Sequence, residues 1–530
     1  MGVYINPGNA DFAEILKLEY IDKTDLIDII NGVVETRKKL VCVSRPRRFG
    51  KSFAAHMLCA YYDCTCNSES LFSGLDISKT ANFKKYLNMY NVVYLDITSF
   101  ISDLKGNGKK IADITNTIKE TILEEMLSYL PDVDRNKNFA QILLEFVEHT
   151  GRKIVFIIDE WDAIIREFRS DEAEQDAYLN FLRGIFKNGN ITSKVVAAAY
   201  MTGILPIKKD GTESAISDFD EYTVLNPDKF AMFTGFTENE VELLCKKHDM
   251  DLKQIKKWYD GYHFENSVSI YNPYSVMNAI EKKRYGSYWR RTTATESLLA
   301  YINMDYKGLQ EDVARLIAGE SLNVDVSTFN NDVENFGNKD DVLTLLIHLG
   351  YLTYDIDNQV VRIPNEEVKT EFVSLFKNRD NSRMSKLIKK SEKILEATLK
   401  LDSQYVAKRI DEIRESEYAP TFYNNEQALR YVIKFAYITC IEQYLKVEEL
   451  PSGRGIADVV FIPRMPSNRP ALVVELKWNK SSEAAINQIK DNKYPSIFDD
   501  YIGEVILVGI NYDEKTKCHD CSIEKITMHI

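Results

Sequence analysis

The chain has 530 residues, of which 45 % are hydrophobic and 28 % are charged, and its formal net charge is −13. A chain of this length exceeds one hydrophobic core, so we expect two to four ordinary globular domains. The acidic balance argues against a global attraction to nucleic acid, although screening over roughly 10 Å leaves room for a local basic cleft. No apolar run reaches the length of a membrane span and the N-terminus is no signal peptide, so we expect no membrane partner.

The eight cysteines are scattered along the chain and often lie beside apolar residues. This usage favours reduced thiols and a cytoplasmic location. Four of them form close pairs, Cys64 with Cys66 and Cys518 with Cys521. A structural zinc site needs four ligands, and neither pair has an evident partner pair, so zinc is not favoured.

A nine-residue segment ending at Ser52 reads S-R-P-R-R-F-G-K-S, between an apolar run at 40–43 and a helical pattern that starts at Phe53. Gly-Lys-Ser at a strand-to-helix turn is typical of a phosphate-binding loop. Its N–H groups receive an anion, Lys51 reaches the outer phosphates, and the Ser52 hydroxyl ligates magnesium. Arg45 stands where the general pattern requires a glycine. The alternative is an ordinary basic loop.

A second motif is the run K-I-V-F-I-I-D-E at 153–160. Its apolar residues predict a central strand of a parallel sheet, covered on both faces. Asp159 then lies at the edge where open α/β folds bind ligands, and it would hold magnesium. Glu160 would polarise the water that attacks the γ-phosphate. The alternative is a buried strand followed by the start of a helix, where acidic residues are also favoured.

Two further apolar runs, 91–96 and 194–203, predict more strands of the same sheet. The second run ends in the hydroxyl of Thr202, a position that senses the γ-phosphate in P-loop ATPases. A plain Thr-Gly strand exit is the equal alternative. The candidate nucleotide-binding residues are therefore those of the loop and of this strand end: Arg47, Arg48, Phe49, Gly50, Lys51, Ser52 and Thr202.

The C-terminal region holds a third constellation. The segments 455–462 and 471–478 predict two strands, and Glu475 and Lys477 share one face of the second. If the strands are adjacent, Asp458 lies beside them. The two carboxylates would bind magnesium, and Lys477 would position or help to deprotonate the water that attacks a phosphodiester. The alternative is a Glu–Lys pair on a solvated strand face.

The surroundings favour the metal site. A helix predicted over 482–494 carries Gln488, and a helix of about five turns begins near residue 425 and brings Glu426 as a third carboxylate. A further strand is predicted at 504–510. The order helix, strand, strand, helix, strand is typical of a compact nuclease core.

Other blocks complete the set: Y-I-D-K-T at 20–24, D-E-W-D at 159–162, and the segments 201–209, 257–264, 271–276 and 288–289. With the phosphate loop and the pattern of Asp458, Glu475-x-Lys477 and Gln488, they resemble an AAA-ATPase-like family. Members of this bacterial and archaeal family end in a PD-(D/E)XK nuclease-superfamily domain. The family tolerates the missing first glycine, so Arg45 departs only from P-loops in general.

This resemblance implies an α/β fold: a P-loop NTPase parallel sheet with a helical and winged-helix lid, followed by an α/β PD-(D/E)XK nuclease-like domain. The expected domains are an ATPase at 1–235, a lid with a winged-helix module at 236–380, a helical connector at 381–420 and the nuclease-like domain at 421–530. For the lid, the helix and hairpin within 341–371 are expected to serve as a lid module rather than to bind DNA. The aromatic block at 257–264 is expected to pack, with His263 structural.

The resemblance also implies function. It implies an ATP-binding and ATP-hydrolysing protein with a magnesium-dependent endonuclease. The endonuclease is expected to act on nucleic acid, on DNA rather than RNA, and the biological setting is defence or mobile elements. ATP and Mg²⁺ are the cofactors, and a homo-oligomer is compatible. The candidate catalytic residues are Lys51, Asp159, Glu160, Asp458, Glu475, Lys477, Glu426 and Gln488. The candidate metal ligands are Ser52, Asp159, Asp458 and Glu475.

Three questions stay open at this point. One alternative is a nucleotide-dependent switch or interaction module whose C-terminal domain binds nucleic acid without cutting it. A weaker one is an enzyme directed at a small molecule or a protein, built on a decorated ATPase core. The basic residues at 37–39 and the loop arginines Arg45, Arg47 and Arg48 would contact phosphate, act as an arginine finger on a neighbouring subunit, or remain solvated.

Overall fold

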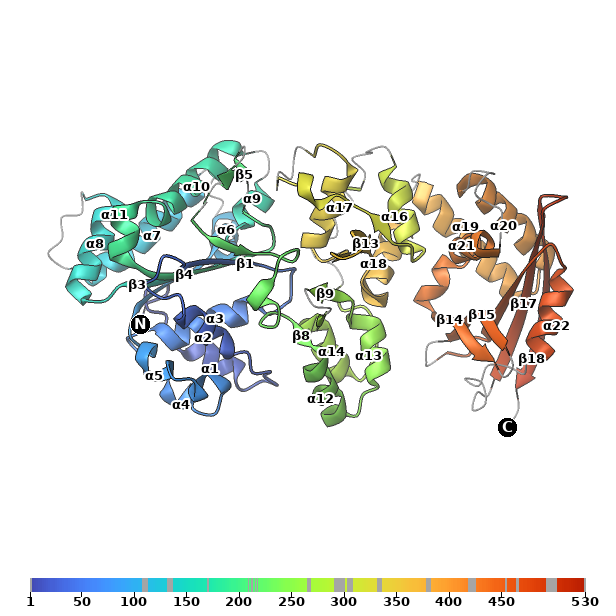
Figure 1. The fold of residues 1–530 in the computed structure, drawn as a ribbon, viewed down its shortest axis with the longest axis horizontal. Helices are drawn as coiled ribbons and strands as arrows, with labels where there is room; N and C mark the ends of the chain where they lie inside the picture. The colour runs from blue at the N-terminus through green and yellow to red at the C-terminus, as the bar shows by residue number, and fades with distance from the viewer. Residues whose placement is uncertain are drawn as a thin grey trace. The chain divides into compact units, whose positions relative to one another are not determined.

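The computed structural model describes residues 2–106, 113–130, 137–168, 171–207, 209–210, 213–214, 216, 218–264, 268–289, 301–302, 308–330, 336–377, 383–417, 426–452, 455–463, 467–491 and 503–528. They form two compact units. Figure 1 labels helices and strands along the chain. The first unit comprises Met1–Tyr288 and Leu322–Asn365, and the second comprises Trp289–Ser321 and Glu366–Ile530. Each unit is described by itself.

The first unit is built on a five-stranded sheet in the order β2-β3-β4-β1-β7, in which every pairing is parallel. Its strands are β1 (Leu40–Ser44), β2 (Asn91–Asp96), β3 (Ile154–Asp159), β4 (Val196–Gly203) and β7 (Asp220–Tyr222). The strands predicted at 40–43, 91–96 and 153–160 are therefore present. The strand predicted at 194–203 begins two residues later, because the preceding helix α11 (Gly189–Val195) extends to Val195.

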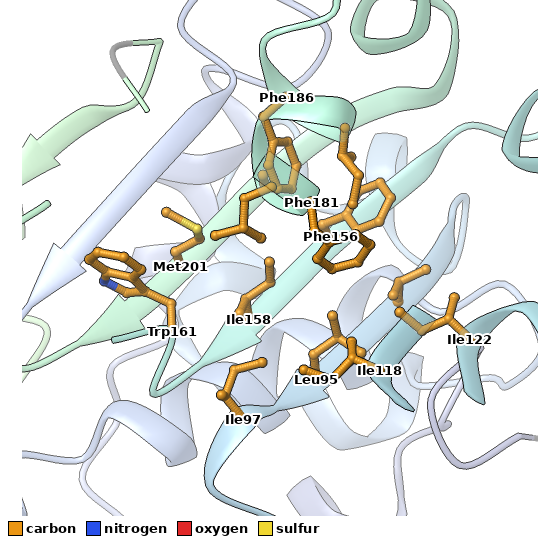
Figure 2. Packing of buried hydrophobic residues seen from close by; sticks show 14 of the residues in the cluster. Leu95, Ile97, Ile118, Ile122, Phe156, Ile158, Trp161, Phe181, Phe186 and Met201 are labelled. Carbon is orange, nitrogen blue, oxygen red and sulfur yellow. The ribbon is translucent and has the colours of Figure 1, made fainter. Parts of the chain in front are cut away.

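Strand β3 shows why this sheet is covered on both faces. All its residues are buried, and they alternate between two hydrophobic clusters. Phe156 and Ile158 belong to one cluster, which Figure 2 shows packed with Leu95, Met201, Phe181 and Phe186. Val155 and Ile157 belong to the cluster on the opposite face. This two-sided burial explains the continuous apolar run in the sequence.

Helices supply both layers around the sheet. One cluster joins the sheet to α1 (Ala10–Ile15), α2 (Asp25–Asn31) and α3 (Lys51–Tyr62). The other joins it to α6 (Ile97–Gly106), α7 (Ile114–Ser128), α8 (Phe139–Thr150), α9 (Ala163–Glu167), α10 (Glu172–Phe186) and α11. Short elements complete this part: α4 (Glu69–Phe72), η1 (Asp76–Lys79), α5 (Phe83–Tyr86), β5 (Lys209–Asp210), β6 (Glu213–Ser214) and η3 (Asp228–Phe230).

The rest of the first unit contains two small subassemblies. The first has its own hydrophobic cluster and consists of β8 (Phe236–Thr237), α12 (Glu238–His248), α13 (Leu252–Tyr259), β9 (Tyr262–Phe264), β10 (Val268–Tyr271) and α14 (Pro273–Lys282). The second consists of β11 (Leu322–Asn323), η5 (Val326–Thr328), α17 (Lys339–His348), β12 (Thr353–Asp355) and β13 (Val360–Arg362). The predicted helices after residue 236 and the predicted helix and hairpin near 341–363 are present. Their role as a lid stays a prediction.

The second unit contains a mixed five-stranded sheet in the order β14-β15-β16-β17-β18. Its strands are β14 (Tyr444–Ser452), β15 (Gly455–Pro463), β16 (Ala471–Trp478), β17 (Gly503–Asp513) and β18 (Cys518–Met528). Only the β16–β17 pairing is parallel, and α22 (Ser482–Asp491) lies between these strands in sequence and packs on both. A parallel pair requires such a crossover.

The helices of the second unit are α16 (Leu309–Ile317), α18 (Glu366–Lys377), α19 (Arg383–Leu399), α20 (Ser403–Glu417) and α21 (Glu426–Ala436). The helix predicted to run about five turns from residue 425 is thus shorter. The backbone of Tyr437 leaves the helical region at φ −114° and ψ 25°, and the chain continues as the 3₁₀ turn η7 (Ile438–Glu442). Within the described residues, the structure holds no helix with the length and apolarity that crossing a membrane requires.

Candidate functional site

The predicted phosphate loop connects β1 to α3, so its backbone leads directly into a helix N-terminus. Gly50 caps that helix in the left-handed conformation, at φ 86°, and Arg48 is also left-handed, at φ 68°. A Cβ at Gly50 would meet no atom within 4 Å, so backbone conformation rather than space favours glycine there. The helix N-terminus presents N–H groups and a positive dipole end, the arrangement that binds phosphate.

Lys51 points into the loop and is only 4 % exposed. Its ammonium donates to the carbonyl oxygens of Arg45 at 3.2 Å and Pro46 at 3.1 Å. It also lies 3.2 Å from Glu160 Oε1. The first residue of α3 is therefore held against the carboxyl end of β3.

Asp159 ends β3 and is buried. Its Oδ1 accepts a hydrogen bond from the Thr202 hydroxyl at the end of β4. Burial raises the pKa of Asp159, and hydrogen bonds from Ser52 and Thr202 oppose that rise. Because β4 lies between β1 and β3, it brings the loop, Thr202 and Asp159 to one edge of the sheet. The predicted role of Thr202 in sensing phosphate stays a prediction.

Glu160 follows Asp159 in a left-handed conformation, at φ 53°. Its carboxylate contacts both Lys51 and the Arg166 guanidinium. Burial alone would raise the pKa of Glu160, but the charges of Lys51 and Arg166 hold it below its ordinary value. A carboxylate kept ionised in this way is a competent hydrogen-bond acceptor for a water molecule.

Arg166 is a residue that the sequence analysis missed. It lies on α9 and bridges two members of the D-E-W-D block, with its Nε 2.9 Å from Asp162 Oδ2. Asp162 also accepts the N–H of Leu205 at 2.8 Å, which ties α9 to the segment after β4. The i, i+4 spacing of Asp162 and Arg166 was a usable signal for this pair.

Arg45 occupies the position at which the general phosphate-loop pattern has its first glycine. The side chain is fully buried, and its guanidinium donates to the carbonyl oxygens of Ser44 at 2.9 Å, Tyr222 at 2.9 Å and Phe230 at 3.2 Å. These hydrogen bonds connect the loop to β7 and to η3. Arg45 is thus structural here and takes neither the phosphate-binding nor the arginine-finger role that the sequence left open.

The two other loop arginines are placed differently. Arg48 donates to the Tyr288 carbonyl oxygen at 2.7 Å and stacks 4.3 Å above the ring of Tyr274. Burial lowers the pKa of the Arg47 guanidinium, as does the nearby charge of Arg166. Arg48 therefore joins the loop to the elements after residue 270.

A cavity of about 820 Å³ opens beside the loop. Loop residues and Glu160 form part of its lining: Arg48, Phe49, Gly50, Lys51, Ser52 and Glu160. Its other polar and charged lining residues are Glu19, Lys23, His248, Asn278, Glu281 and Lys283. Its apolar lining comes from Tyr20, Ile21, Phe53, Ala54, Met57, Phe233, Phe236, Pro273, Tyr274, Met277 and Ile280. An anion-binding loop together with aromatic and apolar lining residues is the chemistry that a nucleoside triphosphate requires. Arg47, Asp159 and Thr202 are not part of the lining.

The Y-I-D-K-T block, which carried no role in the sequence, forms one wall of this cavity. The Lys23 ammonium donates to the Met232 carbonyl oxygen at 2.7 Å and lies 2.6 Å from Glu240 Oε1 of α12. Asp22 accepts the Thr24 hydroxyl at 2.7 Å and the N–H of Asp76 at 2.8 Å. The block therefore fastens the N-terminal segment to α12.

The C-terminal candidate residues converge in the second unit. Strands β15 and β16 pair through Val459 and Val474, and in the described part of the strands their pairing ends there. One further step of this antiparallel register places Asp458 opposite Glu475. The N–H of Leu476 donates to Asp458 Oδ2 at 2.9 Å. The Asp458 carboxylate thus accepts a backbone hydrogen bond at the point where the β15–β16 pairing ends.

Glu475 lies at the centre of this cluster. The Lys477 ammonium is 2.9 Å from Glu475 Oε1, and the Gln488 amide from α22 also donates to Oε1. Burial raises the pKa of Glu475, and the neighbouring charge of Asp458 adds to the rise. The three charged residues, Asp458, Glu475 and Lys477, are all buried. The alternative of a Glu–Lys pair on a solvated strand face therefore does not apply to β16.

The donor set fits magnesium. Mg²⁺ is commonly held by one or two carboxylates and retains several waters, and Asp458 and Glu475 supply two buried carboxylates. Glu426 begins α21, but its side chain lies outside the described residues, so its predicted role as a third ligand stays a prediction. The described residues include no group of three or more His, Cys, Asp and Glu side chains placed to hold a metal.

Comparison with known proteins gives a family match within the first unit. Residues 7–213 match the model of a family described as a predicted AAA-ATPase. No curated protein matches the chain. Similar solved structures include the ORC2 protein of Aeropyrum pernix in ADPNP–ADP complexes, which is 10 % identical, with 67 % of this chain and 95 % of that chain covered and a TM-score of 0.31. The AMPPCP-bound DnaA of Aquifex aeolicus is 10 % identical, with 79 % and 94 % covered and a TM-score of 0.25.

The family match and the phosphate loop concern the same part of the chain. Together they support an ATPase of the AAA type in the N-terminal part of the chain, built on a parallel α/β sheet.

Proposed function

We propose that this protein binds and hydrolyses ATP in its first unit and cuts nucleic acid, DNA in preference to RNA, in its second. The ATPase half is supported by the family match over residues 7–213 and by the cavity beside the loop. The nuclease half is supported by the clustering of Asp458, Glu475, Lys477 and Gln488. That clustering is the observation that carries the proposal.

In the ATPase half, the loop N–H groups and the start of α3 bind the phosphates, and the apolar lining of the cavity receives the base. The Lys51 ammonium exchanges its two carbonyl partners for phosphate oxygens. Glu160 accepts a hydrogen bond from the attacking water, and its lowered pKa keeps it ionised for that role. Ser52 and Asp159 would hold Mg²⁺, which neutralises charge on the transferring phosphate.

In the nuclease half, Asp458 and Glu475 would hold Mg²⁺, which lowers the pKa of a bound water and stabilises charge on the phosphate. Lys477 positions the nucleophilic water or takes part in its deprotonation. Gln488 orients Glu475 through its amide. The helix α21, the strands β15 and β16, the crossover helix α22 and the strand β17 follow the predicted order of helix, strand, strand, helix, strand, and β14 and β18 are additional strands of the same sheet.

The test uses the purified full chain, supercoiled plasmid and Mg²⁺, with and without ATP. We expect nicking that disappears in Glu475→Ala. A matched control is Glu504→Ala, because Glu504 pairs with Lys525 on the exposed face of the same sheet. Absence of cleavage by the native protein on plasmid, linear duplex, single-stranded DNA and RNA would overturn the nuclease half.

The ATPase half has its own test. Calorimetry should detect ATP binding by the native chain and none by Lys51→Ala, since Lys51 is the proposed contact to the outer phosphates. An unchanged affinity in Lys51→Ala would overturn the placement of ATP at this loop. Nicking by Lys51→Ala would indicate a nuclease that works without ATP.

One observation favours a second candidate function. Each carboxylate of the C-terminal cluster contacts a cationic side chain, Asp458 with Arg430 and Glu475 with Lys477. Such pairing would also suit a domain that binds nucleic acid without cutting it, under the control of an ATP-dependent switch. Retained DNA binding with no cleavage in Mg²⁺ or Mn²⁺ would favour this alternative.

A further inference from the structure

Arg430 is a cationic residue of the C-terminal cluster to which no motif assigns a role. It lies on α21, four residues after Glu426, and α21 packs on β16. Its guanidinium donates to Asp458 Oδ1, while Oδ2 of the same carboxylate accepts the Leu476 N–H. Both oxygens of one proposed metal ligand are thus engaged by donors of the protein itself.

The two cations of the cluster differ in accessibility. The Lys477 side chain is 9 % exposed, whereas the Arg430 side chain, which contacts Asp458, is 35 % exposed. Asp458 is 6 % exposed, and a buried carboxylate is costly without a compensating charge. Arg430 supplies that charge, and a divalent cation bound to Asp458 would supply it equally.

A divalent cation and the Arg430 guanidinium therefore compete for Asp458 Oδ1. When the metal supplies the charge, Asp458 no longer requires the guanidinium, and the guanidinium can turn to a phosphate. The planar fork of arginine matches two oxygens of a phosphate, and its partly exposed position suits a ligand that arrives from solvent.

We propose that Arg430 is a displaceable counter-ion: it neutralises Asp458 in the metal-free protein and moves to a non-bridging phosphate oxygen of the nucleic acid when the metal is bound. This inference rests on the proposed nuclease function and deepens it. It assigns Arg430 to substrate binding and makes metal affinity dependent on a residue that is not a metal ligand.

The first test measures Mn²⁺ binding to the full chain without nucleotide, by the loss of the electron paramagnetic resonance signal of free Mn²⁺. The site that disappears in Asp458→Asn is the C-terminal one. Removing the competing cation in Arg430→Gln should tighten Mn²⁺ at this site about tenfold, within the usual range of coupling between two ligands. Arg430→Lys, which keeps the charge, should stay close to the native affinity.

The second test measures plasmid cleavage at saturating Mg²⁺. Arg430→Gln should cleave about tenfold more slowly, the size expected for one lost phosphate contact. Tighter metal with slower cleavage distinguishes this role from damage to the fold, which would weaken both. Arg469→Gln is the matched control, because Arg469 is exposed in the turn before β16, at the end opposite Glu475, and it should change neither quantity.

The outcomes separate the two proposals. Native Mn²⁺ affinity in a folded Arg430→Gln, or tightened Mn²⁺ with native cleavage, would overturn the role of Arg430 and leave the nuclease proposal standing. No Mn²⁺ site dependent on Asp458, together with no cleavage by the native chain, would overturn both.

Discussion

The ammonium of Lys51 lies 3.2 Å from Glu160 Oε1, so the loop that would hold phosphate and the carboxylate that would activate water are in direct contact. Lys51 is thus engaged by Glu160 and by two loop carbonyls at once. Glu160 also contacts Arg166, so it has two cationic partners. If Lys51 turns to a phosphate, as proposed, nucleotide binding would remove one of these two contacts of Glu160.

Glu160→Gln should retain ATP binding and lower the rate of hydrolysis by about 10²–10⁴, the usual contribution of a general base. The amide preserves the shape of the side chain and removes its capacity to accept a proton. Phosphate release at saturating ATP measures the rate, and calorimetry measures the binding. Glu167→Gln on the same segment, where Glu167 pairs with Lys105 near the surface, should leave both unchanged. A near-native rate in Glu160→Gln would remove Glu160 from the mechanism.

Arg45→Gly restores the general phosphate-loop pattern, and we expect it to destabilise the protein. The change leaves three carbonyl oxygens, two of them in buried hydrogen bonds, without the guanidinium that they share, at a cost of about 2–4 kcal/mol. Urea denaturation followed by circular dichroism measures the loss. Arg37→Gly, at an exposed turn residue, is the matched control. Equal stability of the two variants would contradict the structural role of Arg45.

Asp458→Asn should abolish metal-dependent cleavage and leave ATP hydrolysis intact, since Asp458 and the phosphate loop belong to separate compact units. Asparagine keeps the shape and the acceptor for the Leu476 N–H but loses the charge that a cation requires. Plasmid nicking and phosphate release are measured on the same preparation. Asp491→Asn, exposed at the end of α22, serves as the control. A parallel loss of ATP hydrolysis would indicate misfolding or tight coupling instead.

Much of this architecture could be predicted from local sequence. The apolar runs predicted four strands of the first sheet, because strands that are buried on both faces contain few polar residues. The convergence of Asp458, Glu475 and Lys477 followed from the two-residue period of a strand and from the adjacency of β15 and β16. The catalytic roles of these residues stay predictions.

The parts that sequence did not predict depend on contacts between distant residues. Arg45 reaches Phe230, 185 positions away, and Arg430 reaches Asp458, 28 positions away. No local period or spacing encodes such pairs. The early end of α21 is of the same kind, since its apolar pattern continues into the 3₁₀ turn and only the backbone of Tyr437 ends the helix.

His348 gives the first unit a predictable acid sensitivity. It ends α17, is 2 % exposed, and stacks on Phe329 with ring centroids 5.7 Å apart. Burial lowers its pKa to about 3, and its Nδ1 has no hydrogen-bond partner within the described residues. The unfolded chain, with an ordinary histidine pKa of about 6.5, therefore binds more protons than the folded chain between these two values.

The free energy of unfolding should consequently fall as the pH drops below about 6.5, by up to about 1.4 kcal/mol per pH unit from His348 alone, and be independent of this group above that pH. His348→Leu removes the titrating group while keeping an apolar side chain in the core. The slope of the unfolding free energy against pH, between pH 6 and pH 5, should therefore decrease by the equivalent of about one bound proton. Urea denaturation of the full chain at pH 7.5, 6 and 5 measures it. His149→Leu, at an exposed position in the last turn of α8, is the matched control. The same slope in all three proteins would mean that His348 is protonated in the folded state.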